Sequence, residues 1–228
     1  MALTAVPLLL VLAEPALGVA LILVSMLLLQ VTVSGAPRAW VVGLLAAGLL
    51  VGVAAAGLHV IKPYQQPRIT AFLAPAHDTT GTGYHLLQSQ TAIGSGGLLG
   101  SGYLAGDQTN SGFVPEQQTD FIFTVVGEES GLVGSTVLLS LYGLLLWRGL
   151  TLAMRAADPF DMLIASGVTT WLAVQCFINI AMTIGLAPVT GLPLPFLSYG
   201  GSALFATAIG IGLLQNVARR TRRVAGGR

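Results

Sequence analysis

The chain has 228 residues, of which 54% are hydrophobic and only 8% are charged. Soluble domains carry about 25% charged residues, so this composition excludes an ordinary soluble protein and predicts one that lives in a lipid bilayer. The net charge of +1, with no Lys/Arg cluster interleaved with aromatic residues, gives no indication of a nucleic-acid partner.

Five apolar runs are long enough to cross a bilayer as helices. They cover residues 15–33, 39–60, 121–147, 160–186 and 199–217. A shorter run at 3–13 precedes them, and Pro15 would end it, so we expect a leading half-helix there. The predicted fold class is an all-α integral membrane protein, in which residues 1–228 form a single membrane domain built as a polytopic helical bundle.

Residues 61–120 form a long loop between the second and third spans. Its segment "YHLLQSQTAIG" is amphipathic, which is typical of a short helix lying along a membrane surface. The glycines that follow, including Gly96 and Gly97, permit tight turns and close backbone approach, so free N–H groups could form an anion-binding nest. A flexible connector, or small residues that allow helix packing, are the alternatives.

Four of the nine acidic residues fall within "PEQQTDFIFTVVGEESG", residues 115–131. Asp120 stands where a carboxylate can either cap the first turn of a helix or do chemistry, and position alone does not separate the two. Glu128 and Glu129 lie deeper in the apolar run, where acids are rare and indicate function by default. A structural pair with a neighbouring helix is the alternative for them.

The last loop, "GLAPVTGLPLPFLSYGGSA", carries three prolines. Non-helical backbone at membrane depth must be buried in protein or line a cavity, so this loop is either a rigid connector or a cavity wall. The three histidines are scattered, and their spacing predicts no metal site.

The basic residues predict the orientation of the chain in the membrane. If the five spans alternate, eight of the ten Lys and Arg residues fall on one side, including the "RRTRR" tail. We therefore expect the basic tail, residues 218–228, to be cytoplasmic, and both the 61–120 loop and the proline-rich loop to be extracytoplasmic.

Three stretches, "GTGYHLLQSQTAIGSGGLLGSG", "FVPEQQTDFIFTVVGEESGLVG" and "PVTGLPLPFLSYGGSA", closely resemble the SEDS proteins (shape, elongation, division and sporulation). "GDQTNSGFVPEQQTDF" and "SYGGSA" look more like the RodA branch, which serves elongation, than the FtsW branch, which serves division. The resemblance implies a peptidoglycan glycosyltransferase that polymerises lipid II, a disaccharide-peptide on undecaprenyl pyrophosphate, at the outer face of the bacterial cytoplasmic membrane.

The resemblance also implies a set of site residues. The family's essential aspartate falls in a Thr-Asp-Phe motif and matches Asp120, the expected catalytic base, with Glu116 and Glu128 as supporting acids. The expected substrate contacts are Lys62, Arg68, Tyr84, Gln88, Ser89, Ser95, Gly96, Gly97 and Ser198. The chemistry is compatible with a divalent cation, Mg²⁺ or Mn²⁺, between carboxylate and pyrophosphate, but no ligand spacing identifies a metal site, and no other cofactor is expected. The expected partners are a class B penicillin-binding transpeptidase and the membrane proteins of the elongation complex.

Two departures from the family pattern bear on activity. The resemblance covers only the C-terminal half of the family's length, as a misplaced start codon, a gene break or a degenerate copy would explain. The family's Pro-Asp-Leu-Gly motif reads "PALG" here, with Ala16 in place of the aspartate. The alternatives to a polymerase are therefore a non-catalytic fragment that binds partner helices, which these departures favour, and a lipid II transporter, which the gathering of acids on one face disfavours.

Overall fold

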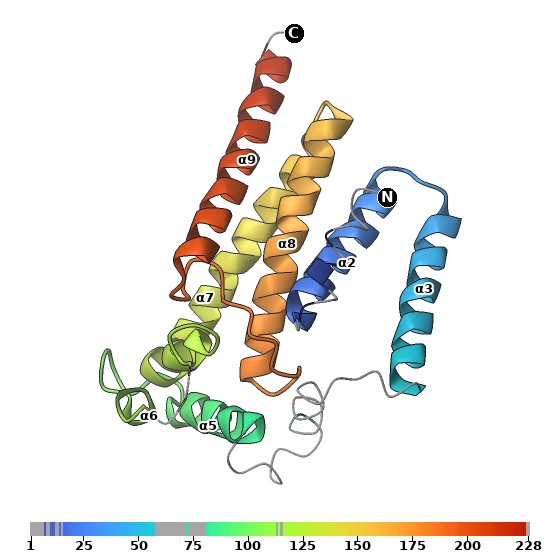
Figure 1. The fold of residues 1–228 in the computed structure, drawn as a ribbon. Helices are drawn as coiled ribbons and strands as arrows, with labels where there is room; N and C mark the ends of the chain where they lie inside the picture. Colours follow the sequence, from blue (N-terminus) through green and yellow to red (C-terminus); the bar gives the residue numbers. More distant parts are fainter. Residues whose placement is uncertain are drawn as a thin grey trace. The chain divides into compact units, whose positions relative to one another are not determined.

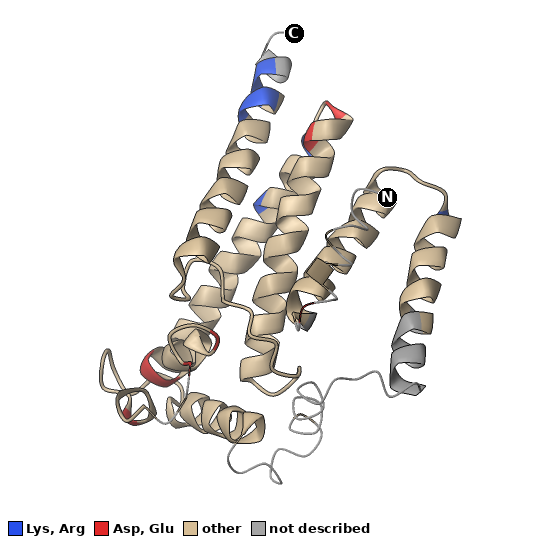
Figure 2. Ribbon diagram, viewed as in Figure 1, with Lys and Arg blue, Asp and Glu red and all other residues tan. Residues whose placement is uncertain are grey.

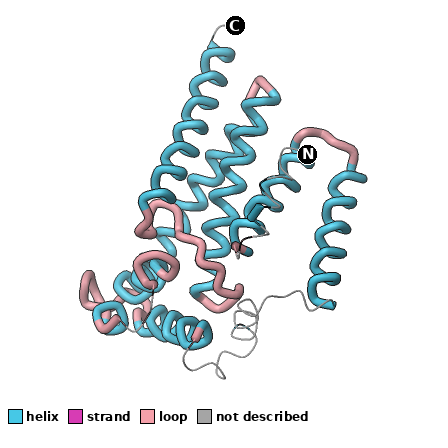
Figure 3. Tube along the Cα trace, in the orientation of Figure 1, coloured by secondary structure: helices cyan, strands magenta, loops and turns pink. Residues whose placement is uncertain are grey.

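A computed structural model describes residues 7, 10–11, 14, 16–57, 72, 81–112, 114 and 116–226. Every regular element among these residues is a helix (Figure 3). In chain order the helices are α2 (Leu17–Val33), α3 (Arg38–Gly57), α5 (Thr82–Ser95), α6 (Asp107–Asn110), α7 (Ile122–Arg155), α8 (Pro159–Thr183) and α9 (Gly201–Gly226), as labelled in Figure 1.

The chain is a polytopic helical membrane protein, as its sequence predicts. Three helices are long and apolar enough to cross a membrane, over Ile122–Arg155, Pro159–Thr183 and Gly201–Arg223. Shorter apolar helices occupy Gly18–Val33 and Arg38–Gly48, which overlap the first two predicted spans. The expected half-helix at 3–13 and the first part of the long loop, 61–80, lie almost wholly outside the described residues.

The chain divides into two compact units. Unit 1 comprises Met1–Gln65, Leu146–Val174 and Ala208–Arg228, and unit 2 comprises Gln66–Leu145 and Gln175–Thr207. The helices α7, α8 and α9 each contribute residues to both units. The two units use these helices in different ways.

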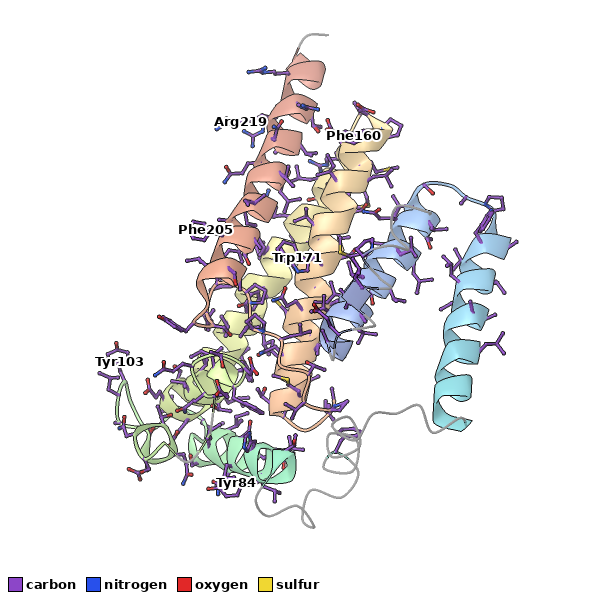
Figure 4. All side chains as sticks on the ribbon, viewed as in Figure 1. Tyr84, Tyr103, Phe160, Trp171, Phe205 and Arg219 are labelled. Atoms are coloured by element: carbon purple, nitrogen blue, oxygen red, sulfur yellow. The ribbon has the colours of Figure 1, made fainter. Side chains whose placement is uncertain are left out.

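In unit 1, helices meet at small residues. A Cβ built at Gly210 of α9 would lie 2.9 Å from the ring of Trp171, which is labelled on α8 in Figure 4. A Cβ at Gly149 of α7 would overlap the Thr169 hydroxyl of α8. Such positions let helices approach closely in a bilayer, where dispersion contacts rather than the hydrophobic effect hold helices together.

The start of α8 shows why that helix begins where it does. Pro159 occupies its first position, where a missing N–H costs nothing, and Asp158 Oδ1 accepts a hydrogen bond from the Phe160 N–H at 3.1 Å. One turn further, the buried Asp161 pairs with Arg220 of α9 at 3.3 Å.

Unit 2 contains α5, α6 and the loops that carry the candidate site. In Figure 1, α5 lies across the end of α8 rather than alongside it. Its buried face is formed by Gly83, Leu86, Ser89 and Ala92, a helical spacing that confirms the amphipathic segment as a helix. The apolar core of the unit is built around Phe123, Tyr142, Cys176 and Leu194.

Candidate functional site

Asp120 lies in a tight turn just before α7. The carbonyl oxygen of Glu116 accepts three backbone hydrogen bonds, from the N–H groups of Thr119, Asp120 and Phe121. Glu116 itself has a φ of +53°, which is uncommon for a residue with a side chain. α7 begins at Ile122, so Asp120 lies two residues before the first residue of that helix.

Two neighbours fix Asp120 from the side of α8. The fully buried Asn179 donates from Nδ2 to the carbonyl oxygen of Asp120 at 2.7 Å and to that of Leu192 at 2.6 Å. Gly191 has a φ of +74°, and a Cβ built there would lie 3.4 Å from Asp120 Oδ2. The half-buried Asp120 carboxylate therefore lies against the backbone of the loop that follows α8.

That loop, residues 184–200, is held in place by side chains of the helices. Gln175 Nε2 donates to the carbonyl oxygen of Pro193 at 2.8 Å, and the Tyr142 hydroxyl donates to that of Pro195. Lipid offers no hydrogen bonds to such carbonyls, so these side chains are what permits irregular backbone here. The arrangement gives Asp120 a rigid neighbour.

α7 is broken at Gly131, inside the predicted span 121–147. Gly131 has φ 62° and ψ −159°, a combination that only glycine adopts readily. A break in a helix leaves unpaired carbonyls on one side and unpaired N–H groups on the other, each costly in lipid. Glycine permits such a break within an apolar run, and hydropathy alone does not register it.

The glycine-rich loop at 96–102 supplies hydrogen-bond partners to the backbone groups around the break in α7. Its backbone makes four hydrogen bonds to α7: Ser101 N–H to Glu128 O (2.9 Å), Gly102 N–H to Glu129 O (3.1 Å), Leu132 N–H to Gly97 O (2.9 Å) and Val133 N–H to Leu98 O (3.1 Å). A Cβ on Gly96 would overlap the carbonyl oxygen of Gly127, and one on Gly100 that of Glu129. These glycines therefore permit backbone-to-backbone packing, and the N–H groups of Ser101 and Gly102 are directed to α7 rather than to an anion.

Glu128 is a buried acceptor, 1% exposed, in the first part of α7. Its carboxylate accepts hydrogen bonds from the Gln108 N–H at 2.7 Å, the Thr109 N–H at 2.9 Å and the Thr109 hydroxyl at 2.6 Å. Figure 2 shows the acids of this region gathered at α6 and the start of α7. Glu128 thus anchors α6 to α7, which explains how this acid is tolerated and makes it a structural support of the loop.

Of the expected contacts on α5, Ser89 faces inward. Ser89 is fully buried and its hydroxyl donates to the carbonyl oxygen of Thr183 at 2.7 Å, at the end of α8. The neighbouring Gln90 donates to the carbonyl oxygen of Ile184 at 3.3 Å. These bonds satisfy carbonyls that the end of a helix leaves open. Ser89 therefore joins α5 to α8.

Tyr84 and Gln88 are half-buried on α5 (Figure 4 labels Tyr84). The Tyr84 ring meets His85 edge to face at 6.4 Å between ring centroids, and His85 meets Phe121 in the same way at 6.4 Å. Since Phe121 follows Asp120 directly, this aromatic chain ties α5 to the turn that carries the candidate base.

The other expected contacts divide into two groups. Ser95 Oγ donates to the Ala92 carbonyl oxygen, and Ser198 Oγ accepts from the Leu194 N–H at 2.6 Å. Lys62 and Arg68 lie outside the described residues. Over the part of the chain that the structure describes, no three His, Cys, Asp or Glu side chains gather as metal ligands.

A mainly apolar groove of about 250 Å³ opens beside the break in α7. Its walls come from the end of α5 and from α7 and α8, and include Ile93, Phe123, Leu139 and Ile184. Phe123 comes one turn after Asp120 in the chain. A chain of methylene and methyl groups would fit this lining, and the groove begins close in sequence to the candidate base.

Sequence reasoning missed Asn179, Gln175 and Tyr142, which position the site. The available signal was a row of polar residues at helical spacing, Gln175, Asn179 and Thr183, inside an apolar span. All three are buried. Polar side chains on one face of a membrane helix face protein rather than lipid, and this pattern could have indicated them.

Three comparisons with known proteins agree. The chain is 41% identical over 214 residues to stage V sporulation protein E of Bacillus subtilis, covering 94% of this chain and 57% of the relative. It is 42% identical over 212 residues to the peptidoglycan glycosyltransferase MrdB of Escherichia coli K12, covering 92% of this chain and 57% of MrdB. The chain thus spans little more than half the length of these curated relatives.

A solved chain from "Structural coordination of polymerization and crosslinking by a peptidoglycan synthase complex" is similar in structure, with a TM-score of 0.78 and 38% identity. The match covers 96% of this chain and 62% of the other. The family model FTSW_RODA_SPOVE, described as cell cycle protein, matches residues 1–223. With nearly every residue inside this match, the chain belongs to the FTSW_RODA_SPOVE family.

Proposed function

We propose that this chain takes part in the polymerisation of lipid II by a peptidoglycan glycosyltransferase, with Asp120 as the general base. The observation that carries the proposal is the fixation of Asp120: Asn179 holds its carbonyl oxygen, and Gly191 lies against its carboxylate. A base that acts in a transition state must be held in place, and here α8 and its following loop supply that restraint. MrdB, which is named as such an enzyme, covers 92% of the chain.

In the proposed reaction, the 4-hydroxyl of the acceptor sugar attacks the anomeric carbon of the donor. The new glycosidic bond forms as the bond to undecaprenyl pyrophosphate breaks, and Asp120 accepts the hydroxyl proton. Lys62 and Arg68 are proposed contacts of the departing pyrophosphate, whose developing charge needs cationic or hydrogen-bonding partners. A Mg²⁺ or Mn²⁺ ion would supply positive charge to the pyrophosphate in the same way. A site with a single protein carboxylate is sufficient for such an ion, because substrate phosphates would provide its other ligands.

The groove beside Gly131 suits the apolar part of such a substrate. Its lining is apolar, and it starts one turn from Asp120 in the chain. Tyr84 and Gln88, half-buried on α5, are the proposed contacts for the polar part. The remaining expected contacts make contacts within the protein, and we propose that they shape the site beside the substrate: Ser89, Ser95, Gly96, Gly97 and Ser198.

Within the family we propose the elongation role. It rests on the RodA-like stretches "GDQTNSGFVPEQQTDF" and "SYGGSA", and on similarity to MrdB, while the similarity to a sporulation protein is almost as high. The proposed partner is a class B penicillin-binding transpeptidase, since a solved relative is described as part of a complex that coordinates polymerisation and crosslinking. The C-terminus is proposed to be cytoplasmic, on the count of basic residues.

Asp120→Asn tests the proposal in a chimera in which this chain replaces the aligned residues of Escherichia coli MrdB. Glycan polymer would be measured from purified lipid II with the transpeptidase present, beside the 228-residue chain alone. Asn keeps the shape but not the basicity of Asp, so we expect a rate loss of about 10²–10⁴ with unchanged thermal unfolding. The exposed Asp107→Asn is the matched control and should keep full activity.

The unsubstituted chimera separates the remaining alternatives. No polymer from a well-folded chimera, beside an active MrdB, would make this chain a non-catalytic fragment. Movement of lipid II across vesicles without polymer would favour a transporter. Near-normal polymer from the Asp120→Asn chimera would remove Asp120 from catalysis.

A further inference from the structure

The end of α9 carries a basic groove that the proposed reaction does not use. It has a volume of about 420 Å³ and is lined by Gly212, Gln215, Asn216, Arg219, Arg220 and Arg223. These residues share one face of the helix, since they recur at intervals of three and four. Figure 2 shows the arginines of α9 concentrated in its last turns, and Figure 4 labels Arg219 among them.

The arginines of this groove differ in what they contact. Arg220 bonds to Asp161 of α8 at 3.3 Å, which fixes one edge of the groove. Arg219 and Arg223 are exposed and, within the described residues, bond to no carboxylate or carbonyl. Two planar guanidinium groups, with the amides of Gln215 and Asn216 beside them, form a set of donors that matches the oxygens of a phosphate group.

The position of the groove along α9 indicates where such a phosphate would come from. Residues 201–218 carry no charge, and at 1.5 Å per residue they extend about 27 Å, close to the thickness of a bilayer's hydrocarbon core. Arg219 is therefore the first charged residue at headgroup level, and Gln215 and Asn216 lie within about one turn before it. Basic clusters directly beyond a membrane helix attract anionic lipids.

We propose that this groove binds the headgroup phosphate of an anionic phospholipid. Arg219 and Arg223 hold the phosphate oxygens, Gln215 and Asn216 supply amide hydrogen bonds, and Gly212 leaves room beside the helix. Arg220 keeps the groove in shape through Asp161. The site would tie the end of α9 to one kind of lipid, independently of the chemistry at Asp120.

Native mass spectrometry of the whole chain in neutral detergent tests the site, with phosphatidylglycerol, phosphatidylcholine and inorganic phosphate as probes. We expect one retained phosphatidylglycerol, no retained phosphatidylcholine, and no displacement by millimolar phosphate. A basic residue at an anionic surface contributes about fivefold in affinity, so the double variant Arg219→Gln/Arg223→Gln should weaken retention roughly 30-fold. Arg148→Gln/Arg155→Gln removes the same charge from exposed positions of α7 and should change little.

Each other outcome overturns the proposal. Equal loss in both double variants would reduce the effect to overall charge, and full competition by phosphate would make the ligand a free anion. Retention by Arg219→Lys/Arg223→Lys at the level of the unsubstituted chain would show surface attraction without a shaped site, because lysine lacks the planar fork. Circular dichroism of each variant checks that its helices are intact.

Discussion

The same three helices, α7, α8 and α9, solve the problem of buried polar groups differently in the two units. In unit 1, buried hydroxyls bond within their own helix, as Thr169 does to the Ala165 carbonyl oxygen at 2.7 Å, and glycines face side chains. In unit 2, some buried polar side chains reach other segments of the chain: Asn179 bonds to two carbonyl oxygens outside the helices, and Glu128 bonds to the N–H groups of α6.

The difference between the units predicts at which residues a substitution lowers the stability of the protein most. A neighbouring side chain can rotate away from an added methyl group, and a helix keeps its backbone bonds when a hydroxyl is lost. A buried loop carbonyl is left with an unmade hydrogen bond when its side-chain donor is removed. Unit 2, which holds the candidate site, should therefore be the more sensitive unit, and the changes below test this in order of expected size.

Gly96→Ala should give the largest loss of stability. The added methyl would overlap the backbone of Gly127, and backbone cannot rotate away, so we expect a cost of about 3 kcal/mol or more in reversible unfolding in detergent. Gly210→Ala in unit 1 meets only side chains, the Trp171 ring and a methyl group of Val168, and should cost clearly less. Gly94→Ala, with open space around it, is the control. Equal costs at Gly96 and Gly210 would contradict the comparison.

Glu128→Gln should release α6 from α7. The amide keeps one acceptor oxygen but sets its own N–H groups against those of α6, so about 2–3 kcal/mol should be lost, with faster hydrogen exchange at residues 107–110. Glu129→Gln is the matched control, because Glu129 Oε1 is buried with no hydrogen-bond partner among the described residues. If the two variants exchange alike, Glu128 is not the anchor.

Asn179→Leu should cost about 1–3 kcal/mol, since it removes the buried side-chain donor that bonds to the carbonyl oxygens of Asp120 and Leu192. Thr169→Val, in unit 1, removes a hydroxyl that bonds only within its own helix and should cost less than 1 kcal/mol. The free energy of unfolding of the two variants would be measured in the same detergent. A larger loss of stability in Thr169→Val than in Asn179→Leu would reverse the expected ranking of the units.

Ala16→Asp should be the smallest effect, and a stabilising one. Ala16 is the residue before α2, and no side-chain hydrogen bond caps that helix at present. An aspartate there should contribute about 1 kcal/mol, and Ala16→Ser nearly as much, because both side chains cap helices well. If only Ala16→Asp raises polymerisation in the MrdB chimera, the departure from the family motif concerns chemistry rather than capping.

Much of the fold could be predicted because it depends on local properties. Long apolar runs form helices in lipid, since only internal hydrogen bonding satisfies the backbone there. A described helix overlaps each of the five predicted ranges, and among the described residues three of these helices are long and apolar enough to cross a membrane. The break at Gly131 could not be read in the same way. It is stable only because a loop some thirty residues earlier in the chain supplies the missing hydrogen bonds.

The candidate site, too, has features that the sequence predicted and features that only the structure shows. Sequence alone indicated Asp120 and the loops around it, because carboxylates, glycines and prolines are conspicuous in an apolar chain. Only the tertiary structure decided that Glu128 anchors α6, that Gly96 packs on α7, and that Asn179 holds Asp120. The physical reason is that hydrophobicity belongs to each residue, whereas a hydrogen bond exists only where folding brings its donor and acceptor together.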